Sequence, residues 1–187
     1  MRLIPALLAG GLAAIVTACG DPNPLPPANL INTEDTVAIY AISGTPVYQP
    51  SGYSTIERVV VRLDASNSAD FAYDITPGGE NIFLPGRLVG GGGGFGSDPG
   101  LLPTATPFDS ITMAEKEGYL TLDTVRVRVG DVFYVRGRVS PLCYLGLPTY
   151  GKAEILSFDE PARSVRFRIL VNGNCGYRSL EPGLPKR

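Results

Sequence analysis

The sequence of 187 residues contains no histidine and no tryptophan. Histidine is the commonest general base and the commonest neutral metal ligand, so its absence excludes a Ser-His-Asp triad and most metal sites. Charge is also scarce, because 16 basic and 18 acidic residues leave a net charge of −2. A chain with so weak a field is not expected to bind nucleic acid. We therefore expect no catalytic residue, no metal and no cofactor.

Glycine and proline, in contrast, are abundant, with 23 and 17 residues. Both interrupt helices, and long helices are accordingly not expected. The hydrophobic fraction of 44% supplies apolar side chains for a core. The composition predicts a single domain without long helices.

The first 18 residues have the features of a signal peptide. Arg2 supplies a positive charge, and residues 3–16 form an apolar stretch that is broken only by Pro5 and two glycines. This length fits a signal-peptide core and is too short for a membrane-spanning helix, which needs about 20 apolar residues.

Residues 16–19 read Val-Thr-Ala-Cys, which resembles the lipobox of bacterial lipoproteins. In that family the peptide is cleaved before the cysteine, which carries diacylglycerol and often a further acyl chain such as palmitate. The resemblance implies that residues 1–18 are removed and that Cys19 anchors the protein to a membrane, since two or three acyl chains anchor stably. Gly20 occupies the position where Asp retains family members in the inner membrane, so the outer membrane is favoured. The alternative is a free cysteine after an ordinary signal peptide.

Residues 19–35 are predicted to be a tether. Four prolines lie within residues 21–27, and such a segment favours extended polyproline geometry with a rise of about 3.1 Å per residue. The folded domain is expected to span residues 36–187.

From residue 36 onward, apolar side chains recur with a period of two, which is typical of strands. In residues 165–171, for example, apolar residues alternate with Arg166 and Arg168. About eight short strands with glycine- and proline-rich connections predict an antiparallel β-sandwich or barrel-like domain. The expected strands include residues 37–42, 58–63, 71–75, 82–84, 119–122, 125–129, 132–139, 152–158 and 165–171.

Two hairpins are expected among these strands. The first joins the two runs of residues 125–139 around Gly130-Asp131, with a bulge at residues 130–132. The second joins residues 152–158 to 165–171 through a turn at residues 159–163. Residues 112–115 fit a capping box and predict a single helical turn, with extension of a strand as the alternative.

Cys143 and Cys175 are expected to form a disulfide, which an exported protein permits. If the last three strands form a meander, the first and third run the same way, and both cysteines then lie beyond one end of the sheet. The outer strands are about 10 Å apart, so the loops must approach until the Cα atoms lie within about 7 Å. A zinc site is the alternative, and two cysteines without histidine make a poor one.

The same topology gathers candidate binding residues at the disulfide end. Tyr144, Tyr150, Tyr177 and Arg178 offer aromatic faces, hydroxyls and a planar donor group, which suit a glycan, a peptide or a protein surface. The alternative is that the tyrosines pack over the disulfide.

Two other segments contain residues of functional interest. Residues 90–94 are all glycine, but no GK[ST] sequence follows to suggest a phosphate site, so residues 88–107 are expected to be a long mobile or contact loop. Asp64, Asn67 and Asp70 carry oxygen ligands suited to calcium, but their spacing is not that of an EF-hand and also fits an ordinary turn.

The sequence predicts a lipid-anchored envelope protein whose β-domain is noncatalytic and binds an envelope glycan, peptide or protein. The alternative is a structural or assembly subunit of an envelope complex. A hydrolase that uses a carboxylate pair, such as Glu115 with Glu117 or Asp159 with Glu160, is the least favoured possibility.

Overall fold

The computed structural model describes residues 25–91 and 98–185, which form a two-layer β-sandwich. This confirms the predicted all-β fold, with ten strands in these two ranges where about eight were expected. Within the described ranges, helical geometry is confined to short 3-10 turns at Gly86–Val89, Phe108–Ser110 and Tyr144–Gly146, and no helix is long and apolar enough to cross a membrane. The strands are β1 (Glu34–Tyr40), β2 (Gly52–Ser54), β3 (Val59–Val61), β4 (Phe71–Ile75), β5 (Asn81–Pro85), β6 (Gly100–Thr104), β7 (Val125–Arg126), β8 (Val132–Arg136), β9 (Tyr150–Asp159) and β10 (Ser164–Asn172).

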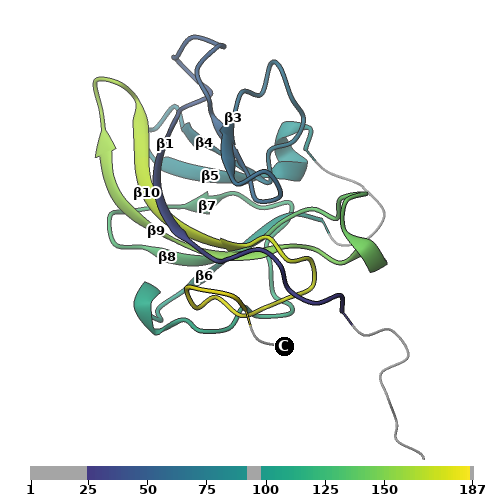
Figure 1. Ribbon diagram of the computed structural model, residues 1–187. Helices are drawn as coiled ribbons and strands as arrows, with labels where there is room; N and C mark the ends of the chain where they lie inside the picture. Colours follow the sequence, from purple (N-terminus) through teal and green to yellow (C-terminus); the bar gives the residue numbers. More distant parts are fainter. Residues whose placement is uncertain (1–24, 92–97, 186–187) are drawn as a thin grey trace, which may run out of the picture.

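The ten strands are divided equally between two antiparallel sheets. The first sheet has the order β1-β10-β9-β8-β6, and the second has the order β3-β2-β4-β5-β7. In Figure 1 the long curved strands β9 and β10 lie in one layer, with β4 and β5 in the other. Because β1 pairs with β10 along its whole length, the beginning of the folded chain lies beside its end.

The predicted meander of the last three strands is confirmed. β9 pairs with both β8 and β10, and the expected turn at residues 159–163 connects β9 to β10. The side chain of Asp159 accepts a hydrogen bond from the Ala162 N–H at 2.9 Å and so closes this turn. The ends of β8 and β10 consequently lie at the same edge of the sheet.

The predicted hairpin of residues 125–139 is wrong. β7 pairs with β5 in the second sheet, whereas β8 pairs with β6 and β9 in the first. The chain crosses between the sheets through a turn at residues 128–131, where Gly130 adopts a φ of 87°. Val127 and Phe133 both point into the core, but from opposite sheets. Periodicity alone does not distinguish this crossing from a hairpin, and the turn takes the place of the expected bulge.

The segment of residues 88–107 is not a loop throughout, because it contains β6. Leu101 in this strand is 1% exposed and belongs to the core. β6 lies at the edge of its sheet, where the proline at position 103 is tolerated because one side of the strand makes no ladder. Part of the glycine run, residues 92–94, lies outside the described residues.

Residues 105–122 cover the outer face of the first sheet instead of forming the expected helical turn and strand. Bridges join Met113 to Ser179 and Leu101 to Leu120, but neither extends into a strand. This cover and the outward side chains of the sheet form a second hydrophobic cluster, made by Phe108, Ile111, Ala114, Tyr119, Val132, Tyr134, Tyr150, Leu170 and Leu180.

Lys152 connects the covering segment, residues 105–122, to the first sheet through hydrogen bonds. Its side chain is buried, and its ammonium group donates hydrogen bonds to the carbonyls of Phe108 (2.9 Å) and Ile111 (2.8 Å). The ammonium also lies 4.5 Å from the centre of the Phe108 ring, and the Arg168 guanidinium lies 4.1 Å from it. Burial lowers the pKa of Lys152, and the two carbonyls offset part of the cost of enclosing the charge.

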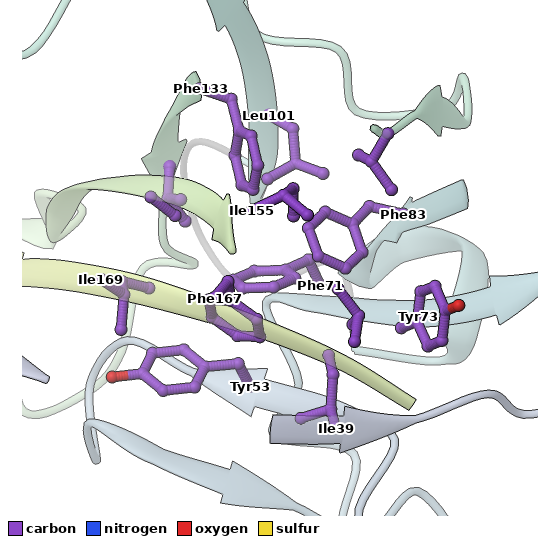
Figure 2. Close-up of a cluster of buried hydrophobic side chains, with 14 of the residues drawn as sticks. Ile39, Tyr53, Phe71, Tyr73, Phe83, Leu101, Phe133, Ile155, Phe167 and Ile169 are labelled. Carbon is purple, nitrogen blue, oxygen red and sulfur yellow. The ribbon is translucent and has the colours of Figure 1, made fainter. Parts of the chain in front are cut away.

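The core between the sheets is built around aromatic rings (Figure 2). Phe71 lies 5.1 Å from Phe83 and 5.7 Å from Phe167 between ring centroids, and Phe83 lies 5.3 Å from Phe133. The four rings come from β4, β5, β10 and β8, so each sheet contributes two. All three contacts are tilted or edge-to-face, which are favourable geometries for aromatic pairs.

Candidate functional site

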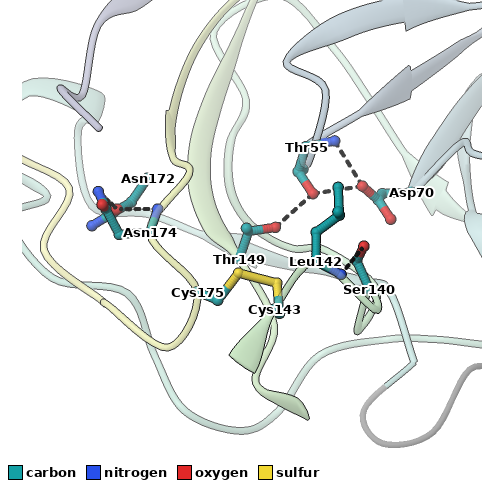
Figure 3. Close-up of a disulfide and its surroundings, with 9 residues drawn as sticks. All are labelled: Thr55, Asp70, Ser140, Leu142, Cys143, Thr149, Asn172, Asn174 and Cys175. Carbon is teal, nitrogen blue, oxygen red and sulfur yellow. Dashed lines mark hydrogen bonds between the residues drawn. A yellow bond between two sulfur atoms is a disulfide. The ribbon is translucent and has the colours of Figure 1, made fainter. Parts of the chain in front are cut away.

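The predicted disulfide joins Cys143 to Cys175, with their Cα atoms 5.4 Å apart. Cys143 lies in the connection after β8, and Cys175 follows β10. The Ser140 hydroxyl accepts a hydrogen bond from the Leu142 N–H, and the Ser140 carbonyl accepts one from the Cys143 N–H. This turn brings the two loops together beyond the end of the sheet (Figure 3).

The residues expected to form a binding rim are largely packed. Tyr150 is 8% exposed and lies in the hydrophobic cluster outside the first sheet, whereas Tyr177 is 4% exposed. Arg178 is half-buried and donates hydrogen bonds to the Ala114 carbonyl. The side chain of Tyr144 lies outside the described part of the structure. The burial of the two tyrosines is the arrangement that the packing alternative predicts.

The end of the expected tether is bound to the domain. The Tyr177 hydroxyl donates a hydrogen bond to the Pro26 carbonyl at 2.8 Å. The side-chain oxygen of Asn174 accepts from the N–H groups of Asn29 (2.9 Å) and Leu30 (3.0 Å), and its amide nitrogen donates to the Leu30 carbonyl. Further along, Asn32 and Gly183 exchange backbone hydrogen bonds. Residues 26–32 are therefore part of the folded structure.

A shallow groove of about 210 Å³ lies where this N-terminal segment meets the disulfide loops. Pro26, Leu30 and Leu142 contribute apolar side chains to it, and Leu142 is 83% exposed. Sequence reasoning did not place residues 26–30 here. The signal that could have indicated this contact is the pair of asparagines at positions 172 and 174, a residue type that often binds backbone groups outside regular structure.

Asp70, Thr55 and Thr149 form a buried hydrogen-bond network, here called the polar joint, that connects the two sheets at the same end of the sandwich. Both side-chain oxygens of Asp70 accept hydrogen bonds: one from the Arg138 N–H (2.9 Å), the other from the N–H (2.7 Å) and hydroxyl (2.5 Å) of Thr55. The Thr55 hydroxyl also lies 2.8 Å from the Thr149 hydroxyl (Figure 3). A Cβ atom at Gly137 would lie 2.0 Å from the Thr55 hydroxyl, so only glycine fits there.

The polar joint does not have the form of a metal site. The three residues considered as calcium ligands do not converge on one point. Asp70 is 1% exposed, whereas Asp64 forms an exposed ion pair with Arg62 at 2.6 Å. The Asn67 carbonyl accepts a hydrogen bond from Arg138. Among the described residues, no three His, Cys, Asp or Glu side chains lie close enough to hold an ion. Burial raises the pKa of Asp70, although its hydrogen bonds with Thr55 and Arg138 act in the opposite direction.

No family model, curated protein or solved structure matches this chain.

The disulfide should stabilise the domain substantially. Replacing Cys143 and Cys175 together with alanine should lower the free energy of unfolding by about 3–4 kcal/mol, because the bond closes a long loop of the unfolded chain. Urea denaturation measures this change. Leu142→Ala, an exposed change in the same loop, is the control. An unchanged unfolding midpoint in the double variant would contradict the expected contribution.

The raised pKa of Asp70 predicts a defined pH dependence. Its carboxyl group ionises at higher pH in the folded protein than its ordinary value of 3.8. Between these two values the unfolded chain binds fewer protons, so the stabilising contribution of Asp70 falls as pH rises through the folded pKa. Urea denaturation from about pH 3.5 to 7 should show wild type losing stability relative to Asp70→Asn as the pH increases.

The control for this experiment is Asp123→Asn, which removes one exposed carboxylate from the chain. A stability difference between wild type and Asp70→Asn that stays constant across the pH range would show that Asp70 does not titrate as its burial requires.

Proposed function

We propose that this chain is a lipid-anchored protein of the bacterial cell envelope, with the outer membrane favoured, and that its β-domain is a noncatalytic binding module. The ligand classes are those expected from the sequence: an envelope glycan, peptide or protein. The proposed anchor, Cys19, lies outside the described residues, and the lipobox resemblance is its support.

The docked N-terminal segment is the observation that carries this proposal. Six residues lead from Cys19 to Leu25, and even fully extended they reach only about 20 Å. Since Pro26 and Leu30 are hydrogen-bonded to the domain, an acylated Cys19 holds the disulfide end close to the membrane. The other end, with the turn at residues 159–163, then faces away from the membrane.

A noncatalytic role is supported by the environments of the reactive groups. Cys143 and Cys175 are joined, and the oxygens of the buried Asp70 are engaged by backbone and hydroxyl donors. The two carboxylate pairs considered for hydrolysis, at positions 115 and 117 and positions 159 and 160, are exposed. A general acid at neutral pH usually needs a buried or apolar setting, which these exposed positions do not provide.

An assembly role is the second candidate, and the connection between β1 and β2 favours it. Val47 and Tyr48 in this connection are 76% and 60% exposed. Tyr40, at the end of β1, pairs with Ser164 at the start of β10, so the connection lies at the end opposite the disulfide. Exposed apolar side chains at that end offer a contact for another subunit.

Lipidation is tested directly by changing Cys19. In the source bacterium, wild type should fractionate with membranes and show an intact mass with acyl chains on Cys19. Cys19→Ala should yield an uncleaved or released form without added mass. The paired change Cys143→Ala with Cys175→Ala is the control, because it removes cysteines but keeps the anchor. Native protein without acyl chains at Cys19 would refute the anchored assignment.

The two candidate roles are separated by photo-crosslinking in intact cells. A benzophenone side chain at position 48 should give no stoichiometric protein adduct if the domain is a glycan- or peptide-binding module, because this position faces away from the anchored end. Position 113, also exposed, serves as the control site. A discrete adduct specific to position 48 would favour the assembly role instead.

A further inference from the structure

A second hollow, separate from the disulfide groove, lies at the edge of the sandwich between the start of β1 and the turn that connects β2 to β3. It has a volume of about 260 Å³ and a mostly polar wall. Behind it lie two almost fully buried core residues from the last part of β10. We call this hollow the edge cleft, and the residues that define it are Asp35, Tyr53, Glu57, Arg58, Ile169 and Val171.

Tyr53 is the unusual member of the edge cleft. The residue is 2% exposed, and its ring packs 5.7 Å from Phe71 and 6.1 Å from Phe167 between centroids. Figure 2 shows its hydroxyl pointing away from this ring cluster. No described residue forms a hydrogen bond with the hydroxyl, whereas a buried tyrosine hydroxyl usually has a partner. The hydroxyl of this cleft-lining residue is therefore available to a ligand.

The charged side chains of the edge cleft are also without ion pairs in the described structure. Asp35 and Glu57 are exposed, and the Arg58 guanidinium donates one hydrogen bond to the Ile31 carbonyl at 3.2 Å. Burial and the nearby Asp35 carboxylate raise the pKa of Tyr53, so its hydroxyl stays protonated at neutral pH. The cleft thus places hydrogen-bond donors beside acceptors.

This combination selects among ligand chemistries. A phosphate group would be repelled by Asp35 and Glu57. A simple cation could pair with these carboxylates, but it offers no acceptor to the Arg58 guanidinium and the Tyr53 hydroxyl proton. An apolar ligand would displace water from the three charged groups and the Tyr53 hydroxyl without offering them a hydrogen bond, which is costly. Hydroxyl groups both donate and accept, so vicinal hydroxyls can bind carboxylates, guanidinium and phenol together.

We infer that the edge cleft binds one saccharide ring, with its hydroxyls toward Asp35, Tyr53 and Arg58. This inference rests on the proposed binding function, for which it names the ligand class. A free amino acid is the competing ligand, because its ammonium and carboxylate groups could pair with Asp35 and Arg58. Two carboxylates against one guanidinium disfavour it, since the carboxylate of the amino acid would meet two like charges.

The place of the edge cleft in the fold makes two sources of saccharide accessible. Asp35 lies at the start of β1 and Val171 near the end of β10, which is the end of the sandwich that also carries the disulfide. In the proposed orientation this end lies near the membrane. The sugar can therefore belong to a glycolipid headgroup or to an insoluble wall glycan, and these share the same hydroxyl chemistry.

Saturation-transfer NMR and titration on the full chain test this inference. The protein is purified in a detergent without a sugar headgroup, and the probes are glucose, galactose and N-acetylglucosamine. At least one probe should bind, and Tyr53→Phe should weaken its binding by roughly three- to tenfold because one hydrogen bond is lost. Asp35→Asn should weaken it at least as much, since charged hydrogen bonds are stronger. Tyr48→Phe is the matched control and should bind as wild type does.

The folding of the key variant is checked separately. Tyr53→Phe keeps the ring and removes a hydroxyl with no partner in the described structure, so its melting temperature should match that of wild type. Cosedimentation identifies the source of the sugar. Binding to phosphatidylethanolamine vesicles only when they contain glycosyl diacylglycerol indicates a headgroup, whereas binding to purified wall glycan indicates a polymer. Either result supports the inference if Tyr53→Phe reduces the binding that is observed.

Three results would overturn the inference: no binding to any saccharide probe, equal binding by wild type and Tyr53→Phe, or binding of free alanine in preference to sugars. None of these results depends on acylation of Cys19, because the measurements use purified protein. If saccharide binding fails while the protein is acylated in cells, the ligand class is wrong and the anchored function stands. If sugars bind but the protein is not acylated in cells, the saccharide inference stands and the anchored function is wrong.

Discussion

Aromatic packing between the two sheets is the interaction on which the rest of this structure depends. Phe71 and Phe83 from one sheet meet Phe133 and Phe167 from the other, and all four are almost completely buried. Burying one phenylalanine side chain contributes about 1.5–3 kcal/mol, so the four rings together contribute about 6–12 kcal/mol, more than the about 3–4 kcal/mol expected for the disulfide. The rings therefore fix how the sheets face each other, and the disulfide fixes the loops at one end. The same packing holds the Tyr53 ring so that its hydroxyl is directed away from the core.

The end of the sandwich that carries the disulfide contains two buried or half-buried hydrogen-bond networks. The joint of Asp70, Thr55 and Thr149 ties the sheets together there, and Asn174 binds the incoming N-terminal segment. Arg58 connects the two hollows: it lines the edge cleft and donates to the carbonyl of Ile31, next to Leu30 in the disulfide groove. In the proposed orientation, anchoring and ligand binding take place at one end of the molecule. The opposite end carries exposed apolar side chains beside a smaller polar network, in which Ser43 bonds to Asp74 and Arg163 donates to the Ser43 carbonyl.

Local periodicity was sufficient to predict the sandwich and the final meander, because apolar residues alternate with Arg166 and Arg168 and the turn at residues 159–163 is short. It was not sufficient for residues 125–139, since alternation shows which side chains face a core but not which sheet contributes them. The disulfide could be predicted because antiparallel pairing makes the first and third strands of the meander run in the same direction, which places both cysteines at one end of the sheet. The edge cleft could not be predicted, because Asp35, Tyr53 and Ile169 are far apart in the sequence and meet only through the packing of β1, β2 and β10. Tyr150 and Tyr177 were predicted at the correct end of the sandwich, but both are buried. Tyr150 packs against the Tyr119 ring, and the Tyr177 hydroxyl donates a hydrogen bond to the Pro26 carbonyl.

The central claim is that the anchored protein holds its disulfide end toward the membrane. Nitroxide labels at Ile31→Cys and Tyr48→Cys test it most directly, because both native side chains are exposed, at 58% and 60%, and lie near opposite ends of β1. Depth is measured on the lipidated protein in vesicles by relaxation from a paramagnetic ion fixed at the lipid headgroups. The account predicts that the label at position 31 lies nearer the bilayer, with the label at position 48 about 20 Å farther away, the approximate length of a seven-residue strand. Equal distances, or a label at position 48 nearer the bilayer, would contradict it.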